Sequence, residues 1–297
     1  MAKLSKKSQS NILFLITTII WGMAFVAQCT VAGKIDLFLF LGARYFLGAL
    51  SLVPVILIFT KKGQKTKNLL AGVVCGVVLF TASALQQYGI NLSPNAGKAG
   101  FITGIYTVLV PIFYFLFFRK KTGINVCFGA VLAVLGLYVL SVQNGINSIE
   151  KADIIIFLGA IMWAIHIIAI DFFVKKANPI KLSFYQFLTC GVLGVLIAFC
   201  VTGVNVTEAV TGLSGILPSL LYVGVLSSGV AYTTQALGQK NADPTYSAII
   251  LSGEAVFAAI GGAIFGIDKM SLRSYVGCFI IFSGIILSQL NIKQKKN

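Results

Sequence analysis

Long runs of apolar residues dominate this chain, and short polar segments separate each run from the next. A helix that rises 1.5 Å per residue needs about 20 apolar residues to cross ~30 Å of hydrocarbon, and the runs have this length. The pattern predicts an all-α integral membrane protein with ten transmembrane helices. We expect these spans near residues 11–32, 37–60, 69–90, 96–118, 124–142, 152–174, 180–202, 214–237, 245–267 and 274–291.

The composition excludes a soluble globular protein. Of the 297 residues, 58% are hydrophobic and only 10% are charged, whereas about a quarter of the residues in a typical soluble domain are charged. High hydrophobicity also excludes a disordered chain. The segments between the expected spans are too short for a soluble catalytic or DNA-binding domain. The first apolar run is too long for a typical signal peptide, so we expect it to remain as the first span.

The net charge of +15 reflects membrane topology. With a cytoplasmic N-terminus, the inside segments carry most of the basic residues, namely Lys3, Lys6, Lys7, Lys61, Lys62, Lys65, Lys67, Arg119, Lys120, Lys121, Lys175, Lys176, Lys181, Lys240, Lys293, Lys295 and Lys296. The outside loops carry only Lys34, Lys98, Lys151, Lys269 and Arg273. The positive-inside rule then predicts a multi-pass protein of the plasma membrane with both termini in the cytoplasm. Basic groups on the inner side attract anionic lipid head groups, and we expect no nucleic-acid partner.

No motif in the chain indicates a metal or a cofactor. The six cysteines all fall inside expected spans without a CxxC pair, which is typical of free thiols that take part in packing. His166 is the single histidine, so a histidine-rich metal site is excluded. The absence of a GxxxxGK[ST] motif disfavours an ATP-driven process.

The two halves of the chain are similar to each other. Residues of the first half recur at a nearly constant separation, Trp21 as Trp163, Gln86 as Gln235, and Gly129 as Gly277. The recurrence predicts two five-helix repeats, at residues 1–145 and 146–297. Because five is an odd number, the second repeat would enter the membrane with the opposite orientation. Inverted repeats are typical of secondary transporters, whose substrate site lies between the repeats near the membrane midplane.

Several motifs together resemble a known family. They are W-G-x-A-F at 21–25, an arginine at 44, A-G-x-A-G-F-I-T-G-x-Y at 96–106, W-A-x-H at 163–166, S-S-G-V-A-Y at 227–232 and L-S-x-E at 251–254. The chain is similar, over essentially its whole length, to ten-helix EamA-type members of the drug/metabolite transporter superfamily. The resemblance implies a secondary-active carrier of a small organic solute, most often an exported amino acid or related metabolite. One departure is Asp268, which follows Gly266 and Ile267 where family members often have Gly-Glu; we expect it to keep a capping or loop role.

Charged side chains inside hydrocarbon are costly, so Glu254 and Arg44 are the first candidates for a functional site. Glu254 would be the one acidic residue near the midplane. We expect it to line the substrate cavity and to act as a proton-coupling group. Arg44 is the one basic residue well inside a span, and it would hold an anionic group of the substrate with its planar guanidinium. The alternatives are a static ion pair between Arg44 and Glu254 and an Arg44 side chain that extends outward to the membrane surface.

Aromatic residues are expected to form the cavity walls. Trp21 and Trp163 lie in the middle of their spans, and their equivalent positions in the two repeats predict opposing walls. His166 follows Trp163 by one turn and shares its helix face. Ordinary packing is the alternative for the tryptophans and His166, and Tyr106 and Tyr232 are further candidates for the lining.

Two glutamines and a proline are candidates for moving parts. Gln86 and Gln235 are expected at opposite mouths of the cavity, where they would make gate hydrogen bonds. The alternative is an interhelical hydrogen bond, typically worth about 0.6 kcal/mol. Pro111 removes the backbone hydrogen bond to Thr107, and we expect a hinge there.

Two other functions stay open at this point. A flippase-like carrier of an amphipathic or lipid-linked substrate would need a lateral opening lined by apolar residues. A membrane-embedded enzyme would need clustered catalytic residues, and the chain has no DxxD or HExxH pattern. We therefore expect no catalytic residue and no cofactor. The expected partners are a small-molecule substrate and the lipid bilayer, with the protein a monomer or homodimer.

Overall fold

The computed structural model describes residues 5–59, 65–119, 123–141, 150–269 and 271–289, and every regular element in these ranges is a helix. Eight of the basic residues used above for topology lie outside the described residues, namely Lys3, Lys61, Lys62, Lys120, Lys121, Lys293, Lys295 and Lys296.

The helices follow the apolar runs of the sequence. The first part of the chain forms α1 (Lys6–Val31), α2 (Leu37–Phe59), α3 (Lys65–Leu92), α4 (Ala96–Gly104), α5 (Tyr106–Phe118) and α6 (Ile124–Ser141). The second part forms α7 (Lys151–Val174), α8 (Pro179–Cys200), α9 (Val206–Gly215), α10 (Leu217–Leu221), a π-helix (Tyr222–Tyr232), α11 (Thr233–Gln239), α12 (Pro244–Leu251), α13 (Glu254–Ile264) and α14 (Leu272–Gln289). Polar side chains cap several helix starts: Asn95, Asn178 and Asp243 accept backbone N–H groups of the first turn.

Seven stretches of the described chain are long and apolar enough to cross a membrane. They are Lys6–Val31, Leu37–Ile58, Asn68–Leu92, Ala96–Phe118, Lys151–Val174, Pro179–Cys200 and Pro244–Ile264. An eighth results if Val206–Gly215 and Leu217–Gln239, which meet at a bend of 85°, form one span. Ile124–Val139 and Leu272–Ser288 are apolar but shorter. The structure therefore supports a multi-pass membrane protein, and the number of ten spans stays a prediction.

Two of the apolar runs are interrupted in the middle. Between α4 and α5, the N–H of Ile105 bonds to the carbonyl of Ile102, three residues back. Between α12 and α13, the N–H groups of Gly253 and Ala255 also bond to carbonyls three residues back. A tighter turn of this kind within a longer helix often marks a hinge. As a result, Tyr106 and Glu254 each stand at the first position of a new helix.

Glycines allow the closest helix contacts. A Cβ atom added at Gly129 of α6 would lie 2.8 Å from the carbonyl oxygen of Gly284 in α14. A Cβ atom at Gly136 would lie 2.8 Å from the carbonyl oxygen of Gly277. The two helices therefore pack backbone against backbone, as small residues permit in membrane proteins.

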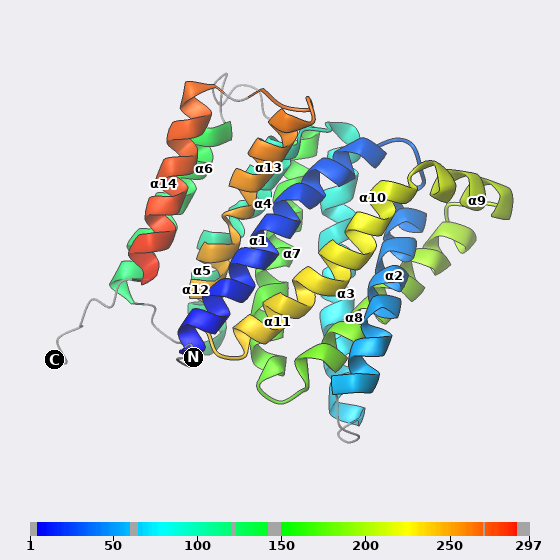
Figure 1. Ribbon diagram of the computed structural model, residues 1–297, viewed down its shortest axis with the longest axis horizontal. Helices are drawn as coiled ribbons and strands as arrows, with labels where there is room; N and C mark the ends of the chain where they lie inside the picture. Colours follow the sequence, from blue (N-terminus) through cyan, green and yellow to red (C-terminus); the bar gives the residue numbers. More distant parts are fainter. Residues whose placement is uncertain (1–4, 60–64, 120–122, 142–149, 270, 290–297) are drawn as a thin grey trace.

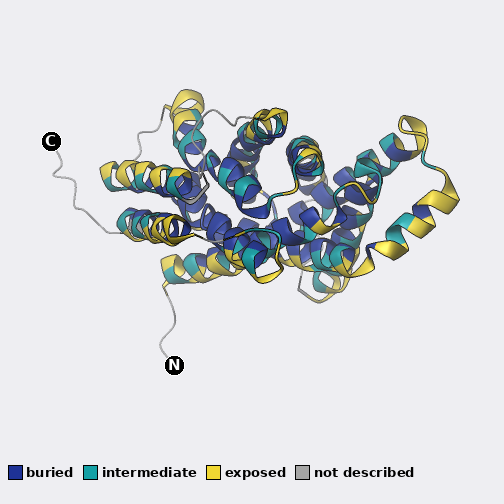
Figure 2. Ribbon diagram, turned by 90° about the horizontal axis from the view of Figure 1, so that it is seen from above, coloured by how far each residue is buried: buried dark blue, intermediate teal, exposed yellow. Residues whose placement is uncertain are grey.

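The helices surround a central group that holds the functional candidates. α1 packs along α13 in the middle of the molecule, with α6 and α14 at one flank and α9 at the other (Figure 1). Buried residues lie mostly on the inward faces, and exposed residues on the outward faces (Figure 2). Large apolar side chains occupy these outward faces, among them Leu57, Leu272 and Phe279. Such a surface suits contact with lipid tails.

Candidate functional site

A cavity between the two halves of the chain brings most of the sequence candidates together. It is lined by Trp21, Ala24, Phe25, Gln28, Arg44, Gln86, Thr103, Tyr106, Trp163, Ile167, Ser227, Tyr232, Gln235 and Glu254. These residues come from α1 to α5 in the first half, and from α7, the π-helix, α11 and α13 in the second. Because no single helix supplies more than a few of them, the cavity depends on how the halves pack.

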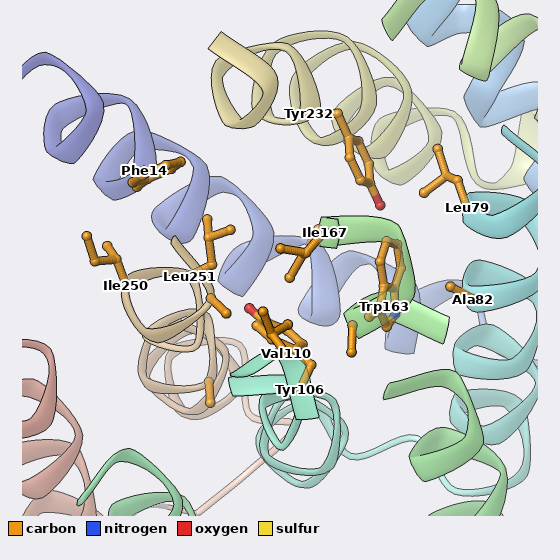
Figure 3. Close-up of a cluster of buried hydrophobic side chains, with 14 of the residues drawn as sticks. Phe14, Leu79, Ala82, Tyr106, Val110, Trp163, Ile167, Tyr232, Ile250 and Leu251 are labelled. Carbon is orange, nitrogen blue, oxygen red and sulfur yellow. The ribbon is translucent and has the colours of Figure 1, made fainter. Parts of the chain in front are cut away.

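Tyr232 is at the centre of an aromatic cluster on the cavity wall. Its ring centroid lies 4.7 Å from that of Trp21 and 6.0 Å from that of Trp163. The two tryptophan rings are themselves 6.4 Å apart. Figure 3 shows Tyr232 reaching from the π-helix toward Trp163 on α7. Trp21 and Trp163 are thus neighbours within one cluster, joined by Tyr232, and their role as opposing walls of the cavity stays a prediction.

Arg44 is buried in the cavity wall, and none of the described acidic residues pairs with it. Its Nη1 donates to Gln28 Oε1 at 3.2 Å, and its Nη2 donates to Ser227 Oγ at 3.4 Å. The guanidinium carbon lies 5.0 Å from the ring centre of Tyr45, a cation–π arrangement. No carboxylate of the described residues forms a salt bridge with Arg44.

Glu254 is equally buried and also lacks an ion pair among the described residues. The hydroxyl of Tyr106 donates to its Oε1 at 3.1 Å. The positive end of the α13 dipole favours a carboxylate at this first helical position. Arg44 and Glu254 line one cavity but do not bond to each other. The static pair considered from the sequence is therefore absent from the described structure.

The two glutamines lie on the wall of the same cavity. Gln86 donates from Nε2 to Thr103 Oγ1 at 3.0 Å. Gln235 is fully buried, and neither of its amide atoms has a hydrogen-bond partner among the described residues. Both residues line one cavity, on which helices of both halves converge, and their placement at opposite mouths of it stays a prediction.

His166 and Pro111 do not line the cavity. His166 is fully buried behind the aromatic cluster, with its Nε2 3.1 Å from Gln186 Oε1 and its ring edge-on to Trp163 and Tyr232. Pro111 lies inside α5. The interruption of this apolar run comes earlier, at Ile105, where the hydrogen bonding tightens.

Most of the cavity residues belong to the motifs that carry the family resemblance. The sequence matches the EamA-like transporter family twice, at residues 9–142 and 150–290. The chain belongs to the EamA-like transporter family. It is therefore a membrane transporter, and the family resemblance seen in the sequence is confirmed.

Relatives of this EamA-like transporter carry transporter names without a stated substrate. An uncharacterized transporter of Archaeoglobus fulgidus is 26% identical, covering 97% of this chain and 88% of the relative. The uncharacterized transporter YvbV of Bacillus subtilis is 24% identical, covering 98% of this chain and 94% of the relative. The uncharacterized transporter YoaV of the same organism is 20% identical, covering 94% and 96%. A solved crystal structure with 16% identity has a TM-score of 0.74 over 95% of this chain and 96% of that chain, which shows a shared fold.

Sequence reasoning missed three polar members of this transporter's cavity. Gln28 lies two turns after Trp21 on the same face of α1, and this spacing is the signal that identifies it. Ser227 belongs to the π-helix, and no sequence pattern predicted the wider winding of that helix. Thr103 was visible only as a residue of a repeated motif.

The cavity is small. The space open to the centre of a water molecule is about 30 Å³, enough for roughly two waters. Such a volume does not accommodate an organic solute, so admission of a substrate requires the surrounding helices to move.

Proposed function

We propose that this protein is a secondary-active transporter that moves a small organic solute by alternating access. In this proposal, inverted five-helix repeats at 1–145 and 146–297 together supply ten spans in the plasma membrane, with both termini in the cytoplasm. Each half takes in turn the conformation of the other, so the central cavity opens first to one side and then to the other. Export of a metabolite or amino-acid-like solute is the direction that the family resemblance implies.

Equivalent contacts in the two halves support the inverted repeat. Gly129 and Gly136 of α6 correspond in the repeat to Gly277 and Gly284 of α14. The contact of Gly129 with Gly284 therefore has its counterpart in the contact of Gly136 with Gly277. The interruptions before α5 and α13 also fall at equivalent repeat positions. The family match divides the chain at the same place.

The observation that carries this proposal is a buried cation and a buried carboxyl group that share a cavity without pairing. Arg44 is available for an anionic group of a solute, and the bond to Tyr106 holds Glu254 at the same cavity. We infer that Glu254 is the coupling group, which exchanges a proton when the cavity changes sides. Charged and amide groups in the lining favour a solute over the lipid-linked substrate of a flippase.

A thermal-shift screen of the purified protein against a metabolite library tests the function. A ligand at 100 times its Kd stabilises the protein by about 2.7 kcal/mol. We expect hits that carry an anionic group, and we expect Arg44→Lys to weaken them because lysine lacks the planar fork. The hits should then accumulate in proteoliposomes that contain the protein. If hits bind but none crosses the membrane faster than in protein-free liposomes, the proposal of transport through this cavity is wrong.

A further inference from the structure

Gln235 has an unusual position for an amide side chain. It lies on α11 at the cavity wall and is fully buried, yet its Nε2 and Oε1 both lack a partner among the described residues. Its repeat counterpart Gln86 faces the same cavity but bonds to Thr103. The two glutamines therefore differ in hydrogen bonding although the repeat makes them equivalent.

A buried amide without partners is costly, because the group has lost its hydrogen bonds to water and gained none. Folded proteins satisfy nearly all such groups, and each exception needs an explanation. Gln235 forms part of a cavity wall, so a molecule admitted when the surrounding helices move is able to supply the missing bonds. The carboxamide presents an N–H donor and a carbonyl acceptor side by side in one plane. Its best partner is a planar group with an acceptor and a donor in the complementary order.

Aromatic residues of the same cavity suit a flat group as well. The rings of Trp21, Trp163 and Tyr232 lie close together at the lining. Aromatic surfaces favour planar partners, which stack offset against a ring or meet it edge to face. Both features restrict the shape of the solute, and the hydrogen-bonding edge of Gln235 would fix its orientation.

We propose that Gln235 is the orienting contact for the transported solute. Its carboxamide makes a pair of hydrogen bonds with a planar donor–acceptor edge of the solute, such as a carboxamide or the edge of a nitrogen heterocycle. The flat group lies against the rings of Trp21, Trp163 and Tyr232. This inference rests on the proposed function, in which the cavity is the substrate site.

Tryptophan fluorescence offers a direct measurement of binding. The chain has two tryptophans, and both line the cavity, so their emission reports on its occupant. Three probes of the same shape separate the chemistry: benzamide has a donor and an acceptor, benzoate has two acceptors, and benzamidine has two donors. Each is titrated into the purified full-length protein and its variants.

We expect Gln235→Met to bind benzamide roughly tenfold more weakly than wild type, because two hydrogen bonds are lost. Without ligand, the same variant should unfold at a higher temperature, because the unsatisfied amide is gone. A merely structural role for Gln235 predicts the opposite change in stability. Gln235→Glu should reverse the preference and bind benzamidine more tightly than benzamide. Gln239→Met is the control for the binding measurement, one turn further along α11, since Gln239 is buried and bonds to the carbonyl of Ile167 but does not line the cavity.

Two results would overturn the inference. Equal affinity of wild type and Gln235→Met for benzamide means that trapped water alone serves the amide, and the proposed transport function is then unaffected. An unchanged order of probe affinities in Gln235→Glu would also contradict the inference. This measurement does not depend on whether the methionine variant folds. Failure of the transport function itself has a different signature, namely metabolite hits that bind but do not cross proteoliposome membranes.

Discussion

At the scale of single residues, Glu254 and Arg44 show both what sequence reasoning finds and where it stops. A charged group within an apolar run is rare, so both residues stand out without a structure. Their partners do not, because spacing along one helix gives no information about its rotation against other helices. The hydrogen bond from Tyr106 to Glu254 and the contact of Arg44 with Gln28 are visible only once the helices are packed.

Glu254→Gln is expected to separate coupling from binding. The variant keeps the acceptor for Tyr106 and breaks no salt bridge of the described residues, so it should remain folded. Loss of one partner of a buried ion pair would instead cost about 3–5 kcal/mol. In proteoliposomes, accumulation driven by a pH gradient should disappear while solute-for-solute exchange continues. Gradient-driven accumulation at the wild-type rate would exclude Glu254 as the coupling group, and a loss of stability would point to a structural role.

The two tryptophans should respond differently to replacement by phenylalanine. Trp21 donates from Nε1 to the carbonyl of Ser227 at 3.2 Å, whereas Nε1 of Trp163 has no partner among the described residues. Trp21→Phe should therefore lower the free energy of unfolding by about 1 kcal/mol through the lost hydrogen bond. Trp163→Phe should lower it less, because no hydrogen bond is lost. Thermal unfolding of the two variants in the same detergent measures the difference, and equal losses would contradict this account.

At the scale of helices, most boundaries follow from the sequence, but the interruptions do not. Apolar runs and polar caps such as Asn95 and Asp243 locate the helix starts. The sequence indicated a hinge at Pro111, since proline is the one residue that must remove a helical hydrogen bond. The structure has its breaks at Ile105 and before Glu254, where glycines precede them and packing between helices decides the winding.

The loop after α13 shows a capping role that the sequence did predict. Asp268 Oδ2 accepts the backbone N–H of Gly97 at 2.6 Å and so joins this loop to the start of α4. Burial raises the pKa of Asp268 above its ordinary value, although the Gly97 hydrogen bond partly opposes the shift. An acid with a raised pKa in the folded state binds its proton more readily there than in the unfolded state. Its contribution to stability therefore falls as the pH rises from the ordinary value of 3.8 through the raised one.

Asp268→Asn is expected to make thermal stability less dependent on pH in this range. Wild type should lose thermal stability as the pH rises through the window, and the variant should not, because asparagine accepts the same hydrogen bond without titrating. Glu208→Gln, which removes an exposed carboxylate on α9, controls for the change in net charge. If the thermal stabilities of wild type and Asp268→Asn change with pH in parallel, Asp268 is not the source of the pH dependence.

At the scale of the whole molecule, periodicity and repeats anticipated an all-helical membrane protein but not the shape of its cavity. The amphipathic faces of these helices are weak guides, because lipid and protein interior are both apolar. Orientation in the membrane depends instead on where the basic residues lie.

Reporter fusions are expected to show alternating sides along the chain. Fusions after Lys176 and Lys240 should report the cytoplasm, and fusions after Lys34, Lys151 and Lys269 should report the outside, because basic loops stay on the cytoplasmic side. Activity and abundance of each fusion are measured together, so that an unstable fusion is not counted. An outside signal after Lys176 would be incompatible with the inverted repeat and with the mechanism built on it.

The small cavity also affects how many protons leak across the membrane while the carrier holds no solute. A space of about 30 Å³ has room for roughly two waters, too few to form a continuous file across ~30 Å of hydrocarbon. Protons hop along such files, and each proton that leaks across 100 mV dissipates about 2.3 kcal/mol. In the proposed transport cycle, a carrier that returns through this form without solute would therefore not short-circuit the voltage across the membrane. In the proposed cycle, the close packing around Tyr232 therefore limits the leakage of protons through the empty carrier.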